Sequence, residues 1–160
     1  MKMNKTNAMR QLDAAKIKYT PCEYEVDEND LSGTHIADQL SLPYECVFKT
    51  LVAKGDKTGH IVFCIPVHRE IDLKRAAVAT GNKRIEMVQV KELLGLTGYI
   101  RGGCSPIGMK KKFPTYFDAS AKEQEKILVS AGVRGAQLCM DPEVLRAFVD
   151  ASYVCVTTTE

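Results

Sequence analysis

The 160-residue sequence contains no tryptophan and only three histidines, His35, His60 and His68. The histidines are not spaced as an i, i+4 pair and do not cluster with cysteines, so the usual ligand patterns of a zinc site are missing. No sequence motif supports a Ser-His-Asp triad either. We therefore expect no metal ion and no cofactor.

Long apolar runs and a strong net charge are also missing. No segment reaches the length of about 20 apolar residues that a transmembrane helix needs, and the first residues lack the apolar stretch of a signal peptide. The net charge is only +2, so no overall field indicates a membrane or DNA partner. We expect a cytoplasmic protein that binds neither, and that meets any anion with a local patch.

Cysteine is more frequent, but no Cys-x-x-Cys motif or tight disulfide framework is present. Most of the cysteines stand among apolar residues, where a free thiol behaves as a small buried hydrophobe. This pattern favours a reduced protein. The six cysteines are Cys22, Cys46, Cys64, Cys104, Cys139 and Cys155.

Hydrophobic residues make up 45% of the chain and charged residues 26%, which is ordinary for a globular protein. No internal repeat, linker or composition shift divides the chain, so we expect one domain over residues 1–160. Helical and strand patterns alternate irregularly, which predicts a mixed α/β fold rather than a simple βαβ repeat. The expected helices are 4–16, 34–40, 73–79, 90–94 and 142–149, and the expected strands are 19–26, 46–53, 60–67, 84–88, 115–117, 127–130, 136–140 and 153–157.

The most informative stretch is Gly102-Gly103-Cys104-Ser105-Pro106-Ile107-Gly108, which is followed at once by three lysines. Glycine has no Cβ, so its backbone N–H can approach a bound group closely. A type I turn from Ser105 to Gly108 fits the spacing. Two interpretations remain open: a plain connecting turn, or a loop that presents backbone donors to an oxyanion or phosphate.

Lys49 is the second notable residue, because it stands in the apolar strand Phe48-Lys49-Thr50-Leu51-Val52. Strand alternation places it on the face of Leu51, opposite Thr50. Two interpretations remain open here as well: a lysine whose stem lies along the sheet while its charge reaches water, or a functional cation.

Other candidates are weaker. Cys104 invites a nucleophile hypothesis, but no histidine stands near it in the sequence to activate the thiol, and we reject that role. The Lys110-Lys111-Lys112 run is most simply a solvated face, with phosphate binding as the alternative.

Three ordered segments, residues 48–51, 97–108 and 129–135, resemble the YbaK/EbsC proteins. These are free-standing relatives of the editing domain inserted in bacterial prolyl-tRNA synthetases, and the likeness covers essentially the whole chain. The resemblance implies an aminoacyl-tRNA deacylase that removes cysteine from mischarged Cys-tRNA(Pro). It also implies a mixed, barrel-like β-sheet flanked by helices. The expected partners are the 3′ aminoacyl-adenosine end of the tRNA and prolyl-tRNA synthetase.

The resemblance assigns roles to individual residues. Lys49 matches the family's essential lysine, and Gly102 begins its Gly-x-x-x-Pro loop. The implied catalytic residues are Lys49, Gly102 and Gly103. The implied substrate-binding residues are Tyr24, Phe48, Thr50, Cys104, Ser105, Pro106, Ser130 and Gly132.

The implied mechanism uses no protein nucleophile. The thiol of the cysteine attacks its own ester carbonyl, and the product leaves as a thiolactone. Backbone N–H groups of Gly102 to Cys104 would stabilise the oxyanion, and Lys49 would hold the phosphate or ribose of the terminal adenosine. An intramolecular thiol needs only orientation, so a large effective molarity is available.

Two positions depart from the pattern, because some relatives carry acids where this chain has Gln137 and Cys139. If those acids take part in recognising or activating the thiol, this protein would differ from such relatives in its rate or in its choice of amino acid. Two alternative functions therefore stay open: a deacylase for another mischarged tRNA such as Ala-tRNA(Pro), and a non-catalytic binding module for tRNA or nucleotides.

Overall fold

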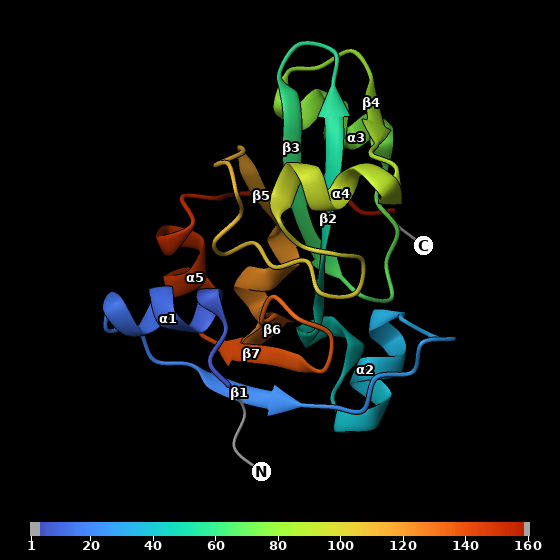
Figure 1. Cartoon of the computed structure of the whole chain (residues 1–160). Helices are drawn as coiled ribbons and strands as arrows, with labels where there is room; N and C mark the ends of the chain where they lie inside the picture. The colour runs from blue at the N-terminus through green and yellow to red at the C-terminus, as the bar shows by residue number, and fades with distance from the viewer. Residues whose placement is uncertain (1–3, 159–160) are drawn as a thin grey trace.

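The computed structural model describes residues 4–158, and the strands in this part form two sheets (Figure 1). The larger sheet has five strands in the order β4-β2-β3-β5-β8. Its strands are β2 (Phe48–Gly55), β3 (Gly59–Pro66), β4 (Ile85–Met87), β5 (Thr115–Asp118) and β8 (Ser152–Val154). β2 and β3 form a long antiparallel hairpin, whereas β3–β5 and β5–β8 are parallel.

The smaller sheet has three antiparallel strands in the order β1-β7-β6. They are β1 (Thr20–Glu23), β6 (Ile127–Ser130) and β7 (Ala136–Met140). A parallel bridge between Val47, just before β2, and Leu128 of β6 joins the two sheets. The predicted mixed α/β fold is confirmed, with its strands divided between two sheets that meet at this bridge.

Helices cover both faces of the larger sheet. Alternate residues of β2 and β3 pack against α3 (Leu73–Thr80), and the others face the glycine loop and α1 (Asn7–Ala14). α2 (Gly33–Leu40) packs where the two sheets meet, with Ala37 against Val47 and Leu128. The remaining helices are α4 (Val90–Thr97), α5 (Pro142–Phe148) and the short 3-10 helices η1 (Tyr44–Cys46) and η2 (Ala119–Glu123).

Local sequence signals explain where these helices begin. Asp72 and Asp141 accept hydrogen bonds from backbone N–H groups at the starts of α3 and α5, and Ser32 does the same for α2. Gly81 ends α3 in the left-handed conformation, at φ 78°. All expected helices and strands are present, but both 3-10 helices were missed. No described helix is long and apolar enough to cross a membrane.

Several elements differ from their predicted bounds: the first and last strands are shorter, the first helix covers Asn7–Ala14 instead of 4–16, and α4 is longer. The last strand ends at Val154, because the Val156 N–H turns to the buried carboxylate of Asp118 at 3.3 Å. The first strand covers Thr20–Glu23 and lies at an edge of its sheet, a place where a proline such as Pro21 is tolerated. α4 runs to Thr97, whose hydroxyl donates to the Leu93 carbonyl at 2.8 Å.

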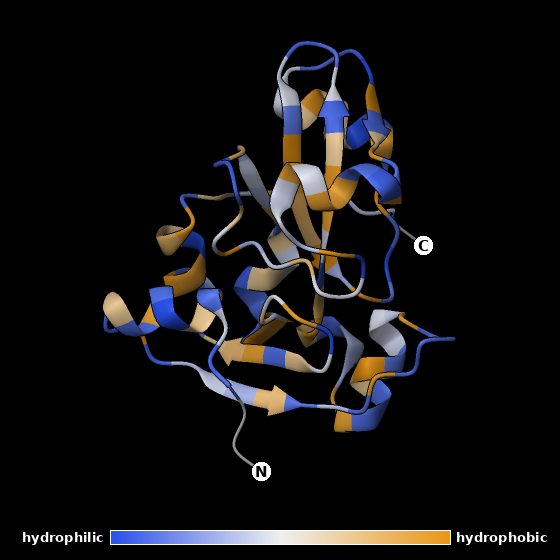
Figure 2. Cartoon of the chain, in the orientation of Figure 1, coloured by the Kyte–Doolittle hydropathy of each residue, from blue (hydrophilic) through white to orange (hydrophobic). Residues whose placement is uncertain are grey.

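Asn82 anchors the far end of the β2–β3 hairpin, where the chain is hydrophilic (Figure 2). Its buried side-chain oxygen accepts from the N–H groups of Lys57 and Thr58 at 2.8 and 3.0 Å. Its amide nitrogen donates to the hydroxyls of Thr58 and Thr80. One side chain thus ties the hairpin loop to the end of α3.

We predict that Asn82→Ala lowers the free energy of unfolding by about 2 kcal/mol, because it leaves buried donors and acceptors without partners. Urea unfolding followed by circular dichroism measures this change. Asn29→Ala, at an exposed loop position, serves as the control. Equal stability of the two variants would contradict the anchoring role.

Candidate functional site

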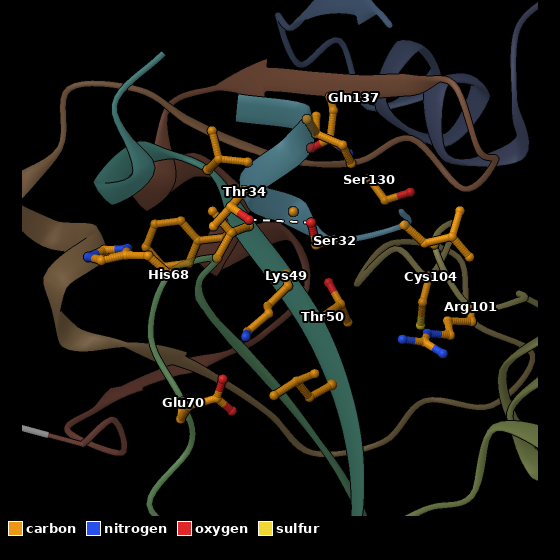
Figure 3. A pocket seen from close by; sticks show the side chains of 18 residues that line it. Ser32, Thr34, Lys49, Thr50, His68, Glu70, Arg101, Cys104, Ser130 and Gln137 are labelled. Atoms are coloured by element: carbon orange, nitrogen blue, oxygen red, sulfur yellow. Dashed lines mark hydrogen bonds between the residues drawn. The ribbon is translucent and has the colours of Figure 1, made fainter. Parts of the chain in front are cut away.

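A cavity of about 560 Å³ lies where the two sheets meet (Figure 3). Its wall is built from five segments that are distant in the sequence. These are the start of α2 (Leu31, Ser32, Gly33, Thr34, Ile36), β2 and the residue before it (Val47, Phe48, Lys49, Thr50, Leu51), the segment from Val67 (Val67, His68, Glu70), the glycine loop (Arg101, Gly102, Cys104) and the β6–β7 hairpin (Ser130, Gln137).

Lys49 contributes a half-buried cation to this wall and forms no ion pair within residues 4–158. Its side chain lies on the same side of the cavity as the carboxylate of Glu70 (Figure 3). Ser32, Gly33 and Thr34, at the N-terminus of α2, line the wall as well. The first N–H groups of a helix lack partners within the helix and favour an anion. This part of the cavity therefore suits a negatively charged group.

The backbone of β2 also faces the cavity at Thr50. The Val67 N–H donates to the Val47 carbonyl at 2.8 Å, which fixes the phase of the β2–β3 ladder. In an antiparallel pair, alternate residues direct their backbone groups to the same neighbour, so Lys49 points its amide at β3 and Thr50 points away. β4 pairs with β2 only from Ala53 onward. The N–H and carbonyl of Thr50 are therefore directed toward the open edge.

The glycine loop enters the wall through a tight turn. The Gly103 N–H donates to the Ile100 carbonyl at 2.9 Å, and Gly102, the third residue of this turn, has φ 85°. A positive φ at that position is typical of a type II turn and favours glycine. The turn exposes Gly102 and Cys104 to the cavity, whereas Gly103 packs against the backbone of Val133, 3.1 Å from the Cβ that it lacks.

Two side chains hold this loop in place. Arg134, in the β6–β7 hairpin, donates through Nε to the Arg101 carbonyl at 2.9 Å and forms an ion pair with Glu28. The Tyr99 hydroxyl donates to the Ile107 carbonyl at the other end of the loop. The loop and the hairpin are thus fixed relative to one another.

Gln137 and Ser130 form the polar wall of the smaller sheet. They are direct cross-strand partners on β7 and β6, so their side chains share one face. Figure 3 shows them on the side of the cavity away from Lys49 and Glu70. The Gln137 side-chain oxygen is buried and has no hydrogen-bond partner in the described part of the chain.

Cys104 brings a thiol to the cavity wall, but the thiol is not activated. Burial raises the pKa of the Cys104 thiol to about 12. The same cause raises the pKa of Cys64 to about 12. Both thiols are therefore protonated at neutral pH, whereas nucleophilic attack requires the thiolate.

A family model described as an aminoacyl-tRNA editing domain matches residues 32–148. The chain belongs to the aminoacyl-tRNA editing domain family. It is 46% identical to EbsC of Enterococcus faecalis, a candidate Cys-tRNA(Pro)/Cys-tRNA(Cys) deacylase, over 98% of this chain and 95% of that protein.

Solved structures share the editing-domain fold. A candidate trans-editing enzyme for prolyl-tRNA synthetase superposes with a TM-score of 0.79 at 20% identity, covering 97% of this chain and 99% of that one. A hypothetical protein superposes with a TM-score of 0.84 at 18% identity, covering 93% of this chain and 97% of that one. The membership in the YbaK/EbsC family that the sequence indicated is confirmed by the family model and by EbsC.

Six of the predicted site residues line this editing-domain cavity together: Lys49, Gly102, Phe48, Thr50, Cys104 and Ser130. Five do not line it: Tyr24, Gly103, Ser105, Pro106 and Gly132. Each of these five has a structural contact of its own. The N–H of Gly103, which was expected to stabilise an oxyanion, is already bound to the Ile100 carbonyl.

The other four residues outside the cavity wall have structural contacts as well. Ser105 is fully buried, and its hydroxyl accepts from the Ile107 N–H at 3.2 Å. Pro106 lines a different cavity, next to α5. The Tyr24 N–H donates to the Gly135 carbonyl, and Gly132 lies against the ring of Tyr99.

Sequence reasoning missed several wall residues, above all Ser32, Thr34, His68, Glu70 and Arg101. Ser32 has the residue type of a helix cap, and it caps α2, but nothing local links a cap to a site. Glu70 reaches the wall through the turn that follows β3, in which the Arg69 N–H donates to the Pro66 carbonyl at 3.0 Å.

We predict that iodoacetamide alkylates the exposed Cys155 and leaves Cys104 and Cys64 unmodified at pH 8 in the folded protein. The two buried thiols are protonated there, because each pKa lies near 12. Peptide mass spectrometry after brief labelling reads out each site, and labelling in urea controls for peptide detection. Rapid labelling of Cys104 in the folded protein would revive a nucleophilic role.

Proposed function

We propose that this protein deacylates mischarged Cys-tRNA(Pro) in trans. The proposal is supported by the family, by the 46% identity to EbsC and, above all, by the cavity that brings Lys49 and the Gly102 turn together. A 560 Å³ cavity is in the range of ligand sites and can hold the aminoacyl end of a tRNA, whereas the body of the tRNA must lie outside it.

Lys49 and the N-terminus of α2 would hold the ribose-phosphate of the terminal adenosine. A lysine is a compact point charge on a flexible stem, and the helix N-terminus adds partial positive charge. Both line one cavity. The amino acid would then extend from the ribose toward the Gly102 turn and the polar wall of Ser130 and Gln137.

The reaction that we propose takes its nucleophile from the substrate. The cysteine sulfur forms a bond to its own ester carbonyl carbon and the ester C–O bond breaks. The thiol proton ends on the ribose hydroxyl of the released tRNA, and the other product is a four-membered thiolactone. By this step the enzyme is a lyase, although water then opens the thiolactone. The pKa of about 12 for Cys104 and the full burial of Ser105 support a site without its own nucleophile.

The oxyanion of this step would be stabilised by backbone N–H groups. Gly102 and Cys104 line the cavity, and Thr50 directs its N–H to the same open edge. Fixed donors of this kind need no reorganisation as charge develops on the carbonyl oxygen. Gly103 has no part in this arrangement.

Selection of tRNA(Pro) would require a partner, because one small domain offers little surface for reading a whole tRNA. We propose prolyl-tRNA synthetase as that partner and the cytoplasm as the location. The free cysteines of the chain support a reducing compartment.

We predict that Lys49→Ala lowers kcat/KM for Cys-tRNA(Pro) deacylation by about 100-fold, because the ribose-phosphate loses its only lysine contact on the described cavity wall. Release of radiolabelled cysteine measures the rate. Lys54→Ala changes an exposed lysine on the same strand outside the cavity and should remain active. Full activity of Lys49→Ala would overturn its role. If the wild-type protein binds Cys-tRNA(Pro) but does not deacylate it, the protein is a non-catalytic binding module.

We also predict that Gly102→Ala loses at least about 10-fold in kcat/KM, because its Cβ would lie 3.2 Å from Arg134 Nε and strain a φ of 85°. Gly98→Ala is the matched control: its φ is also 85°, but it lies outside the cavity wall. Both variants should melt at similarly reduced temperatures. If Gly98→Ala loses as much activity, the effect is backbone strain alone.

A further inference from the structure

Gln137 is the one side chain with an unexplained polar atom in the described part of the chain. The residue is 3% exposed, and its side-chain oxygen has no hydrogen-bond partner. A buried acceptor without a partner costs about 1–3 kcal/mol. Such groups are rare in native proteins and call for an explanation, and a bound ligand that donates to the oxygen is the one that a cavity wall offers.

The fold places this amide rigidly. β7 is the central strand of the smaller sheet, and Gln137 is paired with Cys22 on β1 and with Ser130 on β6. Its side chain lines the cavity beside Ser130 (Figure 3). A polar group held by a central strand keeps its position, so it can discriminate between ligands that differ by one hydrogen-bonding group.

The charges around the cavity decide which part of a substrate reaches Gln137. The cavity wall carries one carboxylate, that of Glu70, and it lies on the side of Lys49 (Figure 3). An α-ammonium buried beside Gln137 would have no carboxylate to pair with, which is costly. A neutral donor fits this place better, and in an aminoacyl ester of cysteine the neutral donor is the side-chain thiol.

We propose that the Gln137 amide oxygen accepts a hydrogen bond from the substrate's side chain, and so selects amino acids with a thiol or hydroxyl on Cβ over alanine. This inference rests on the proposed function, because it takes the ligand to be an aminoacyl-adenosine end. An amide oxygen does not remove the proton at neutral pH. Gln137 is therefore a specificity residue that orients the sulfur, and the bonds made and broken remain those within the substrate.

The sharpest test measures binding without chemistry. The probes are 3′-amino-3′-deoxyadenosines that carry cysteine, serine or alanine through a stable amide. For the wild type, isothermal titration calorimetry should show roughly threefold tighter binding of the cysteinyl probe and roughly tenfold tighter binding of the seryl probe than of the alanyl probe. These factors follow from the strength of one neutral hydrogen bond, weaker for a thiol donor.

Variants of matched size separate recognition from packing. Gln137→Met removes the acceptor and should bring the three affinities within about twofold of each other, because the thiol or hydroxyl of the probe then has no acceptor to bind. Gln124→Met, outside this cavity, should behave as the wild type. Melting temperatures report any general loss of packing.

The outcomes distinguish this inference from the proposed function. If the wild type binds all three probes equally, or if Gln137→Met keeps the preference, the inference is wrong even though deacylation persists. If no probe binds and Cys-tRNA(Pro) is not deacylated, the proposed function has failed. The wild-type comparison decides the matter even if Gln137→Met does not fold.

Discussion

The bridge between Val47 and Leu128 is the contact on which the rest of the site depends. It attaches the smaller sheet to the strand that begins at Phe48, and β4 covers that strand again only from Ala53. The edge between these two points has no neighbouring strand in the described structure. An open strand edge exposes unpaired backbone groups. Here it forms one wall of a cavity, with Lys49 and Thr50 in the middle of the gap.

The opposite wall depends on the packing of a loop against a hairpin. Arg134 ties the Arg101 carbonyl to the β6–β7 turn, and the absence of a Cβ at Gly103 lets the two backbones approach closely. Gly102 and Cys104 on the loop and Ser130 on the hairpin therefore face one space. The two neighbouring glycines therefore have different roles: Gly102 faces the cavity, and Gly103 allows the close packing behind it.

Sequence patterns predicted the parts of this structure that are set locally. Every expected helix and strand and the alternation around Lys49 are found, and the caps at Asp72 and Asp141 follow from the same short-range rules. The site was only partly predictable, because its wall combines five distant segments. Thr34 reaches it through the position of α2, and Glu70 through the turn that follows β3. Resemblance identified Lys49 and Gly102 but did not show that the Gly103 N–H is bound within a turn.

A cavity without an activated nucleophile still offers a consistent chemistry. Its thiol at Cys104 is held protonated by burial, and its cation and helix N-terminus suit a ribose-phosphate rather than a carbonyl. The protein then has to orient the substrate, and the rate of an intramolecular reaction depends strongly on that orientation. A neutral acceptor at Gln137 is compatible with this division of labour, because it would fix a sulfur without competing for its proton. A carboxylate there would instead attract the α-ammonium, so the neutral amide is itself an element of selection.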